Sequence, residues 1–269
     1  MSSSISTTSS AVSSASGGLV NRVPKIILIY WVIKMASTTL GETGADQFSM
    51  TDKFGYGHTI LIFMGIFAIF LAIKLAMKHY DPVMYWLTFT STAIAGTAIS
   101  DFIDRSLGLG YLWGSLILVS LLGTILMLWY LREKSIQVEH ITTAGGEVFY
   151  WLAFLVANTL GTAAGDFLSD QVGLGFAPSA ALIGGVLLLI AFLHFFTRIS
   201  SILLFWLAFV LTRPFGATFG DFLTKPIEQG GIALGTLGAS AVFAAILVLA
   251  VAREAWLEKN RQNTMSELD

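Results

Sequence analysis

The stretch Trp31-Val-Ile-Lys-Met-Ala-Ser-Thr-Thr-Leu-Gly41-Glu-Thr-Gly-Ala45-Asp46 sets out a pattern that the chain repeats four times. A tryptophan is followed by a glycine, then one helical turn later by a small residue, and directly after it by aspartate. The other copies run from Trp86 through Gly96 and Ser100 to Asp101, from Trp151 through Gly161 and Gly165 to Asp166, and from Trp206 through Gly216 and Gly220 to Asp221. The outer intervals between tryptophans are equal and the middle one is longer. Because an internal repeat decides the architecture, this spacing predicts two fused halves of two repeats each.

The composition is that of an integral membrane protein. Hydrophobic residues make up 55% of the 269 residues and charged residues only 12%, whereas a soluble domain has about 25% charged residues. The net charge of −2 argues against a nucleic-acid partner, and the absence of cysteine excludes disulfides and thiolate metal sites. We therefore expect the lipid bilayer to surround an all-α, polytopic protein.

Eight apolar stretches are long enough to be transmembrane helices, because roughly 20 residues cross a ~30 Å hydrocarbon core. They pair into four two-helix repeats that point the same way, at about 24–78, 79–132, 144–197 and 199–253, within one membrane domain of residues 22–256. The expected helices are 24–45, 57–77, 82–103, 110–131, 147–168, 174–196, 199–221 and 231–252. The Ser/Thr-rich residues 1–21 are expected to be a disordered tail, and residues 257–269 a polar C-terminal tail.

Loop charges orient the predicted helices. Only Lys53, Arg105 and Lys225 lie near the aspartate ends, while most basic residues lie at the opposite ends. By the positive-inside rule, both termini are cytoplasmic and the aspartates face outward. Tyr and Trp residues near the cytoplasmic ends suggest an interfacial belt. The basic residues on that side are Arg22, Lys25, Lys74, Lys78, Arg132, Lys134, Arg198, Arg253, Lys259 and Arg261.

Each aspartate-bearing helix carries a polar stripe at four-residue spacing, next to a stripe of small residues. Polar groups on such helices must face protein or water, and small residues let helices approach closely. We therefore expect these four helices to surround a common centre, with the other four outside. The stripes read Thr38-Glu42-Asp46, Ala93-Thr97-Asp101, Asn158-Thr162-Asp166 and Arg213-Ala217-Asp221.

The four aspartates have two interpretations. A carboxylate at a helix C-terminus is opposed by the helix dipole, so each aspartate could instead cap a following turn. Alternatively, the four could converge on a cation, as acidic rings do in cation pathways. His58 lies on the same side and is a weak candidate for a metal site.

Three charged residues break the fourfold repeat and are candidate path or gating residues. Lys34 stands where the other copies have phenylalanine, and Glu42 is the only acid at its position. Arg213 stands seven positions after the tryptophan of the last copy, where the other copies have uncharged residues. Charges inside a membrane are functional-site candidates that need a partner. Because the first and last repeats become neighbours in a closed ring, we predict that Arg213 pairs with Glu42 or Asp46.

The fourfold tryptophan-to-aspartate pattern, over about residues 22–256, resembles a family of bacterial multi-pass inner-membrane proteins described as predicted membrane-anchored proteins. The resemblance implies a bacterial cell inner membrane and hints at metal. It implies no residue roles.

The sequence favours a transporter of a small cation, with a divalent metal as the candidate substrate. Asp46, Asp101, Asp166 and Asp221 would form the outer site, and Lys34, Thr38, Glu42, Thr97, Asn158, Thr162 and Arg213 would line or gate the path. One alternative is a non-transporting assembly or sensor protein with capping aspartates. Another is a transporter of anions or small organic solutes that uses Lys34 and Arg213. Enzyme motifs are absent from the sequence, so catalysis is not expected.

Overall fold

The computed structural model describes residues 21–77, 79–136 and 141–266, and over these residues the protein is helical. Of the predicted N-terminal tail only Asn21 falls within them, and Lys78 and the last three residues of the chain also lie outside. Short π-helical segments, η1 to η3, follow the first three aspartates. The long helices are α1 (Leu28–Asp46), α2 (Gly55–Met77), α3 (Pro82–Asp101), α4 (Gly110–Glu133), α5 (Ala144–Asp166), α6 (Phe176–Phe196), α7 (Ser201–Thr224) and α8 (Thr236–Ser266).

Local sequence explains where several of these helices begin and end. Asp81 accepts a hydrogen bond from the backbone N–H of Met84 at 2.8 Å, and Pro82 opens α3. An acceptor before the first turn and proline within it are both favourable at a helix start. Gly173 and Gly175 have positive φ angles of 77° and 80° between α5 and α6. Glycine adopts this conformation without a steric penalty, which explains the Gly-x-Gly signal after the aspartates.

The four aspartate-bearing helices form a closed ring. α1 packs against α3 and α7, and α5 packs against the same two helices. At every interface, the first glycine of one repeat lies against the residue seven positions after the tryptophan of the next repeat. These contacts are Gly41 with Ala93, Gly96 with Asn158, Gly161 with Arg213 and Gly216 with Thr38. The last contact joins the fourth repeat to the first, so the ring is complete.

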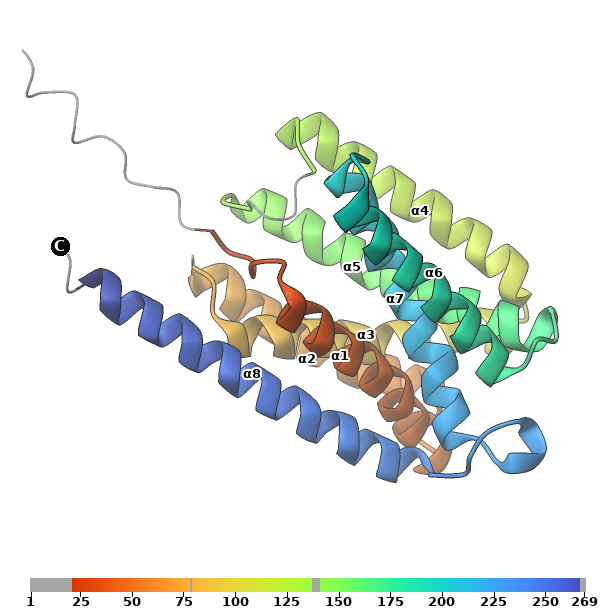
Figure 1. The fold of residues 1–269 in the computed structure, drawn as a ribbon. Coiled ribbons are helices and arrows are strands. Elements are labelled where there is room, and N and C mark those ends of the chain that lie inside the picture. Colours follow the sequence, from red (N-terminus) through yellow and green to blue (C-terminus); the bar gives the residue numbers. More distant parts are fainter. Residues whose placement is uncertain (1–20, 78, 137–140, 267–269) are drawn as a thin grey trace, which may run out of the picture.

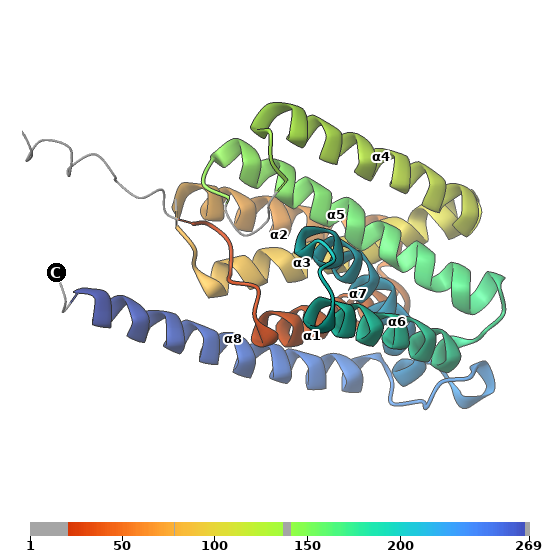
Figure 2. The same cartoon turned by 45° about the horizontal axis from the view of Figure 1, so that its top comes forward.

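The other four helices cover the outside of the ring, each on the odd-numbered helix of the following repeat. α2 packs on α3, α4 on α5 and α6 on α7, while α8 returns to α1. In Figures 1 and 2, α4 and α8 lie along opposite edges of the molecule, with α1, α3, α5 and α7 between them. The two helices of one repeat are therefore joined in sequence, while the main packing crosses to the next repeat.

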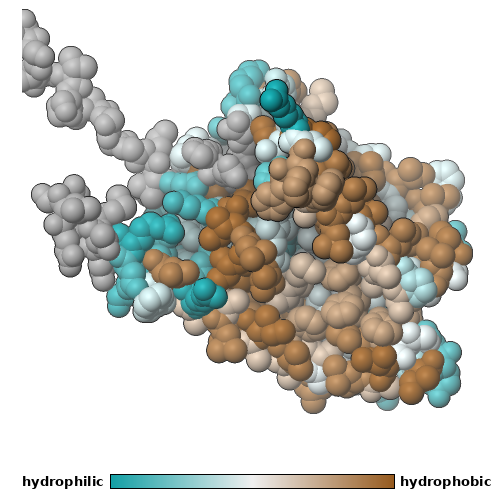
Figure 3. Space-filling view, in the orientation of Figure 1, coloured by the Kyte–Doolittle hydropathy of each residue, from teal (hydrophilic) through white to brown (hydrophobic). Residues whose placement is uncertain are grey.

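The outer surface is apolar. Six of the helices among the described residues are long and apolar enough to cross a membrane, namely α2 and α4 to α8. In the apolar 18-residue stretch of α8 only 6% of the residues are buried inside the protein, against 72% in the corresponding stretch that begins in α5. Figure 3 shows hydrophobic residues over most of the visible face, with hydrophilic residues gathered toward its margins. These features are those of a membrane protein.

The aromatic residues correct one sequence expectation. Tyr85, Trp86, Tyr150 and Trp151 are buried, at 0 to 2% exposure, and pack with Phe154 in an aromatic cluster between the odd-numbered helices. The prediction of an interfacial belt is therefore wrong for these residues. They are packed inside the protein, between the odd-numbered helices and against α4 and α8, where apolar burial and edge-to-face contacts stabilise them.

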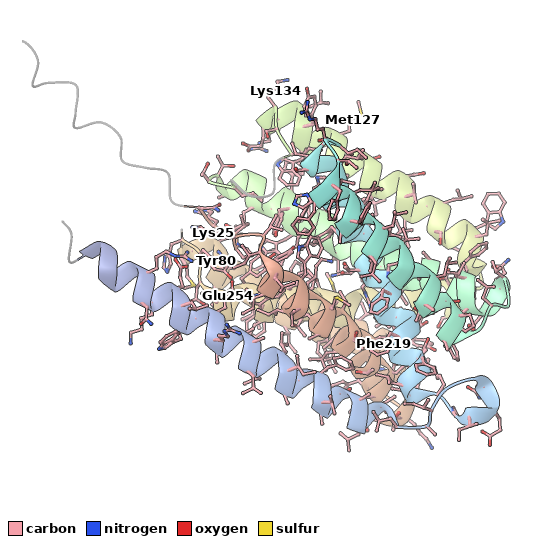
Figure 4. The ribbon with its side chains drawn as sticks, viewed as in Figure 1. Lys25, Tyr80, Met127, Lys134, Phe219 and Glu254 are labelled. Carbon is pink, nitrogen blue, oxygen red and sulfur yellow. The ribbon has the colours of Figure 1, made fainter. Side chains whose placement is uncertain are left out.

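The end of the molecule opposite the aspartates is held by two polar clusters. Glu147 pairs with Arg22 at 2.5 Å and with Lys74 at 3.2 Å. Glu254 of α8 accepts hydrogen bonds from Tyr80 at 2.5 Å and from the indole of Trp86 at 2.8 Å. Tyr80 and Glu254 lie close together in Figure 4. α8 also remains helical beyond Leu257, so part of the predicted polar tail extends this helix.

Candidate functional site

The four aspartates gather at one end of the ring, and two basic side chains bridge them in pairs. Lys225 Nζ lies 2.6 Å from Asp46 Oδ2 and 3.2 Å from Asp221 Oδ1. The guanidinium of Arg105 lies 3.2 Å from Asp101 Oδ1 and 3.4 Å from Asp166 Oδ2. The carboxylates are 2 to 3% exposed. Four buried acids therefore share two cations, which leaves the ring acidic.

The bridging cations remain charged because of these aspartates. Burial lowers the pKa of Lys225, but the carboxylates of Asp221 and Asp46 outweigh burial and raise its pKa above that of a free lysine. Burial also acts against the charged form of Arg105, and Asp101 and Asp166 again raise its pKa overall. A carboxylate at hydrogen-bonding distance favours the protonated, positively charged form of a lysine or arginine side chain.

None of the first three aspartates caps the turn that follows it. The α-helices run through the glycines to the aspartates and continue as π-helices, η1 (Gln47–Thr51), η2 (Phe102–Ser106) and η3 (Phe167–Gln171), with no capping bond from the aspartate side chains. Short π-helical turns are rare and occur frequently at functional sites. The carboxylates are free to face the centre and the bridging cations.

One turn deeper, Arg213 and Glu42 form the ion pair that the sequence predicted. Arg213 Nη2 lies 3.2 Å from Glu42 Oε2 and donates to Thr162 Oγ1 at 2.8 Å and to Thr97 Oγ1. Glu42 Oε2 also accepts from Thr97 at 3.2 Å and from Thr162 at 3.4 Å. Arg213, Glu42, Thr97 and Thr162 come from four different helices, so this network lies at the centre of the ring.

The remaining predicted path residues lie at helix interfaces near this network. The carbonyl of Thr38 accepts a hydrogen bond from Arg213 Nη1 at 2.9 Å, so Thr38 contributes through its backbone. Asn158 donates to Thr92 Oγ1 at 3.0 Å and joins α5 to α3. Asn158 makes no hydrogen bond to Glu42 or Arg213 among the described contacts.

Lys34 lies on the other side of Arg213, toward the aromatic cluster. Its side chain is 0% exposed and donates to Thr212 Oγ1 at 2.5 Å and to the carbonyl of Phe209 at 2.9 Å. The ammonium nitrogen also lies 3.7 Å from the centre of the Phe209 ring. From the aspartate end inward, the centre therefore presents carboxylates, the Arg213–Glu42 pair, Lys34 and then aromatic rings.

Three carboxylates are close enough to share one metal ion. One oxygen each of Glu42, Asp46 and Asp221 lies within 4.8 Å of the other two, and all three residues are buried. His58 does not belong to this group, because it is exposed and its Nδ1 lies 2.9 Å from the carbonyl of Phe54. Asp101 and Asp166 lie on the opposite side of the ring, bridged by Arg105.

A partly open cavity of about 440 Å³ gives access to this end of the ring. Asp221, Lys225 and Arg105 contribute to its wall. Met50, Asp170, Phe176 and Gln229 complete the lining. The same aspartate that contributes to the three-carboxylate group therefore faces a space large enough for water or a hydrated ion.

Arg105 and Lys225 are the site residues that the sequence analysis missed. In the sequence they stand out only as loop charges that orient the helices. Both stand nineteen positions after the tryptophan of their repeat and four after its aspartate, in the second and fourth repeats only. This i, i+4 spacing between acid and base on a helix was the available signal.

The family described as Repeat of Unknown Function (DUF347) matches residues 29–80, 84–135, 149–200 and 204–260. These four matches coincide with the four copies read from the tryptophan-to-aspartate pattern. No curated protein and no solved structure matches the chain.

Proposed function

The chain belongs to the DUF347 repeat family, and from the centre that its four repeats enclose we propose that it is a membrane transporter of a small cation. The observation that carries this proposal is the buried group of Glu42, Asp46 and Asp221, whose oxygens lie within 4.8 Å of one another. Buried carboxylates are retained where they are paired or bind cations.

The architecture that accompanies this function is eight transmembrane helices in four parallel repeats and two fused halves. α1 and α3 are not among the six most apolar helices, but their polar stripes face the ring and α8 and α2 cover their outer sides. Both termini would be cytoplasmic, and the aspartates would face outward across a bacterial inner membrane. Because the chain has no cysteine, single-cysteine labelling at Lys53 and Lys134 tests this orientation. Labelling of both from the same side would contradict it.

The donor set indicates the class of cation. Three carboxylate oxygens, without nitrogen or sulfur, suit Mn²⁺, Mg²⁺ and Ca²⁺. Lys225 Nζ lies 2.6 Å from Asp46 Oδ2, at the edge of the same group. A divalent ion that binds there would replace this ammonium as the partner of Asp46. Lys225 is thus a counter-charge that holds the carboxylates together between transport events.

The fixed positive charges favour coupled transport over an open channel. Arg213 and Lys34 follow the carboxylates along the proposed path, and both are 0 to 1% exposed. A cation that passes them is repelled unless their positive charge is lost or moved. The buried aromatic cluster beyond Lys34 closes the path toward the cytoplasm in this conformation.

Uptake of ⁵⁴Mn²⁺ into proteoliposomes tests the proposal. Asp46→Asn and Asp221→Asn each remove a charged ligand, so we expect uptake at limiting Mn²⁺ to fall about 10- to 100-fold, as is typical when a metal site is weakened. Asp52→Asn is the matched control, because Asp52 is exposed and bonds to Gln47. Competition by Mg²⁺, Ca²⁺ and Zn²⁺ then ranks the substrates.

Equal uptake by wild type, Asp46→Asn and empty liposomes would contradict the proposal. It would then favour a non-transporting membrane protein. Uptake of an anion or a small organic solute that depends on Lys34 and Arg213 would favour the organic-solute alternative. Arg105 and Lys225, which line the cavity, would be the first cations that such an anionic solute meets.

A further inference from the structure

Two buried lysines in this protein differ in their partners. Lys74 is 0% exposed and lies 3.2 Å from Glu147 Oε1. Lys34 is equally buried, yet among the described residues it makes no ion pair with a carboxylate. Its contacts are neutral: a hydroxyl, a carbonyl and two aromatic rings. A buried amine without a counter-ion costs free energy in its charged form. A structural ion pair therefore does not explain why a lysine is buried at position 34.

The surroundings of Lys34 fit both protonation states of its amine. A neutral amine has two N–H donors, and among the described residues it donates to two acceptors, Thr212 Oγ1 and the Phe209 carbonyl. An ammonium has a third donor, and the ring of Phe209, 3.7 Å away, offers its negative face to the positive charge. The ring of Phe89 lies further off, at 5.5 Å. The amine can therefore gain or lose a proton while it keeps both of its hydrogen bonds, to Thr212 and to Phe209.

Within the described part of the chain, the neighbouring elements place one other charge beside this amine. On α7 it is Arg213, next in the chain to Thr212 and already paired with Glu42. α3 presents Phe89, with Tyr85 one turn away bonded to Tyr150, and its Asp101 lies at the far end of the helix. On α1, Tyr30 lies in the aromatic core and Glu42 is about 12 Å along the axis. On α8, Glu254 is bound by Tyr80 and Trp86.

From this geometry we infer that Lys34 is the proton-exchange site that couples cation transport to counter-transport of H⁺. This inference rests on the proposed function. When a divalent cation binds at Glu42, Asp46 and Asp221, the ammonium of Lys34 releases one proton and becomes a neutral amine. When the cation leaves, the amine takes up one proton from water. Each cycle thus exchanges one divalent cation for one proton at this residue and moves one net positive charge.

The position of Lys34 explains why the two events exclude each other. Glu42 and Asp46 of the cation site lie on the same helix as Lys34, α1, and Asp221 lies on α7 with Thr212, the partner of Lys34. Both sites are buried in the centre of the ring, where exposure to water is low. Two positive charges repel strongly in such surroundings. Phenylalanine occupies the equivalent position in the other three repeats, so the ring contains one such amine.

Calorimetric titration of the purified protein with MnCl₂ at neutral pH measures the proton directly. Heats recorded in PIPES and in Tris, which differ in ionisation enthalpy, give the number of protons released per Mn²⁺ bound. Because metal binding is linked to proton release, we expect Lys34→Met to release about one proton fewer than wild type. Lys34→Gln, which can still bond to Thr212 and Phe209, serves if Lys34→Met does not fold. Lys74→Met is the matched control and should release as many protons as wild type.

Proteoliposomes that contain a pH-sensitive dye supply the second readout. Mn²⁺ influx through wild-type protein should raise the internal pH, because protons leave. In Lys34→Gln, Mn²⁺ should enter down its gradient with no pH change, and an imposed pH gradient should not drive accumulation. If the Lys34 variants bind Mn²⁺ and release as many protons as wild type, the inference is overturned while the cation site stands. If wild type binds no Mn²⁺ and takes up none, the proposed function itself fails.

Discussion

Arg213 is the residue at which the four repeats meet. One guanidinium nitrogen contacts side chains from α1, α3 and α5, and another contacts the backbone of α1. Glu42 is its only carboxylate partner among the described ion pairs. Buried pairs of this kind contribute less to stability than their geometry suggests, but removal of one member leaves the other charge uncompensated.

Arg213→Met should therefore destabilise the protein by about 3 to 5 kcal/mol, since it leaves Glu42 buried without a cation. Glu42→Gln in the same chain removes the second charge and should recover most of that loss. Unfolding in mixed detergent and SDS micelles compares wild type, Arg213→Met, Glu42→Gln and the double variant. If the double variant loses as much free energy of unfolding as the two single variants together, the broken ion pair does not explain the destabilisation.

Individual residues also show how much of the candidate site can be predicted from the sequence. Glu42, Lys34 and Arg213 were predictable as candidates because they break a fourfold pattern, and closure of the ring brought Arg213 next to Glu42. Asn158 was assigned to the path from its place on the stripe. Its amide bonds to Thr92 across the α3–α5 interface, a contact that the stripe alone does not predict.

At the scale of elements, glycine determines how closely the odd-numbered helices pack. Gly41, Gly96, Gly161 and Gly216 each lie against a side chain of the next repeat, where a Cβ would overlap it. The helix-to-helix approach in a bilayer depends on such small residues. The small-residue spacing predicted a ring of four helices. It could not predict that α2, α4 and α6 pack on the following repeat, because loop length alone allows either neighbour.

Gly161→Ala should weaken the ring at the α5–α7 interface. A Cβ at this position meets Arg213 and Pro214, and overpacking of this kind costs about 1 to 3 kcal/mol. Gly123→Ala on α4 is the matched control, because a Cβ there meets nothing within 4 Å. Alanine is the better helix former by about 0.5 to 1 kcal/mol, so the control should be neutral or stabilised. Thermal unfolding followed by tryptophan fluorescence compares them, and equal melting temperatures would contradict close packing at Gly161.

In the whole molecule the helix packing repeats four times, whereas the bridges between aspartates occur only twice. The glycine contacts repeat four times, but a bridging cation occurs only in the second and fourth repeats, where Arg105 and Lys225 each join an aspartate to that of the next repeat. The longer middle interval in the sequence predicted the two halves. The bridges were not predicted, because each depends on which repeat lies beside the next once the ring closes.

Two half-chains, residues 1–136 and 137–269, should assemble when they are co-expressed. The contacts of α1 with α7 and α8, and of α5 with α3 and α4, all join one half to the other. Each half alone would expose its polar stripes to lipid, which cannot satisfy them. Affinity purification through a tag on one half should therefore recover the other.

Self-pairing of the first half should not replace this assembly. In such a dimer, Ala93 would stand at each position that Arg213 occupies in the full ring, so two copies of Glu42 would be buried without a guanidinium. An uncompensated buried charge is strongly destabilising. We therefore expect residues 1–136 alone to be degraded or aggregated, and Glu42→Gln to increase the yield of a dimer of that half. A stable wild-type dimer of residues 1–136, seen by size-exclusion chromatography with light scattering, would show that the Arg213–Glu42 pair does not select the partner.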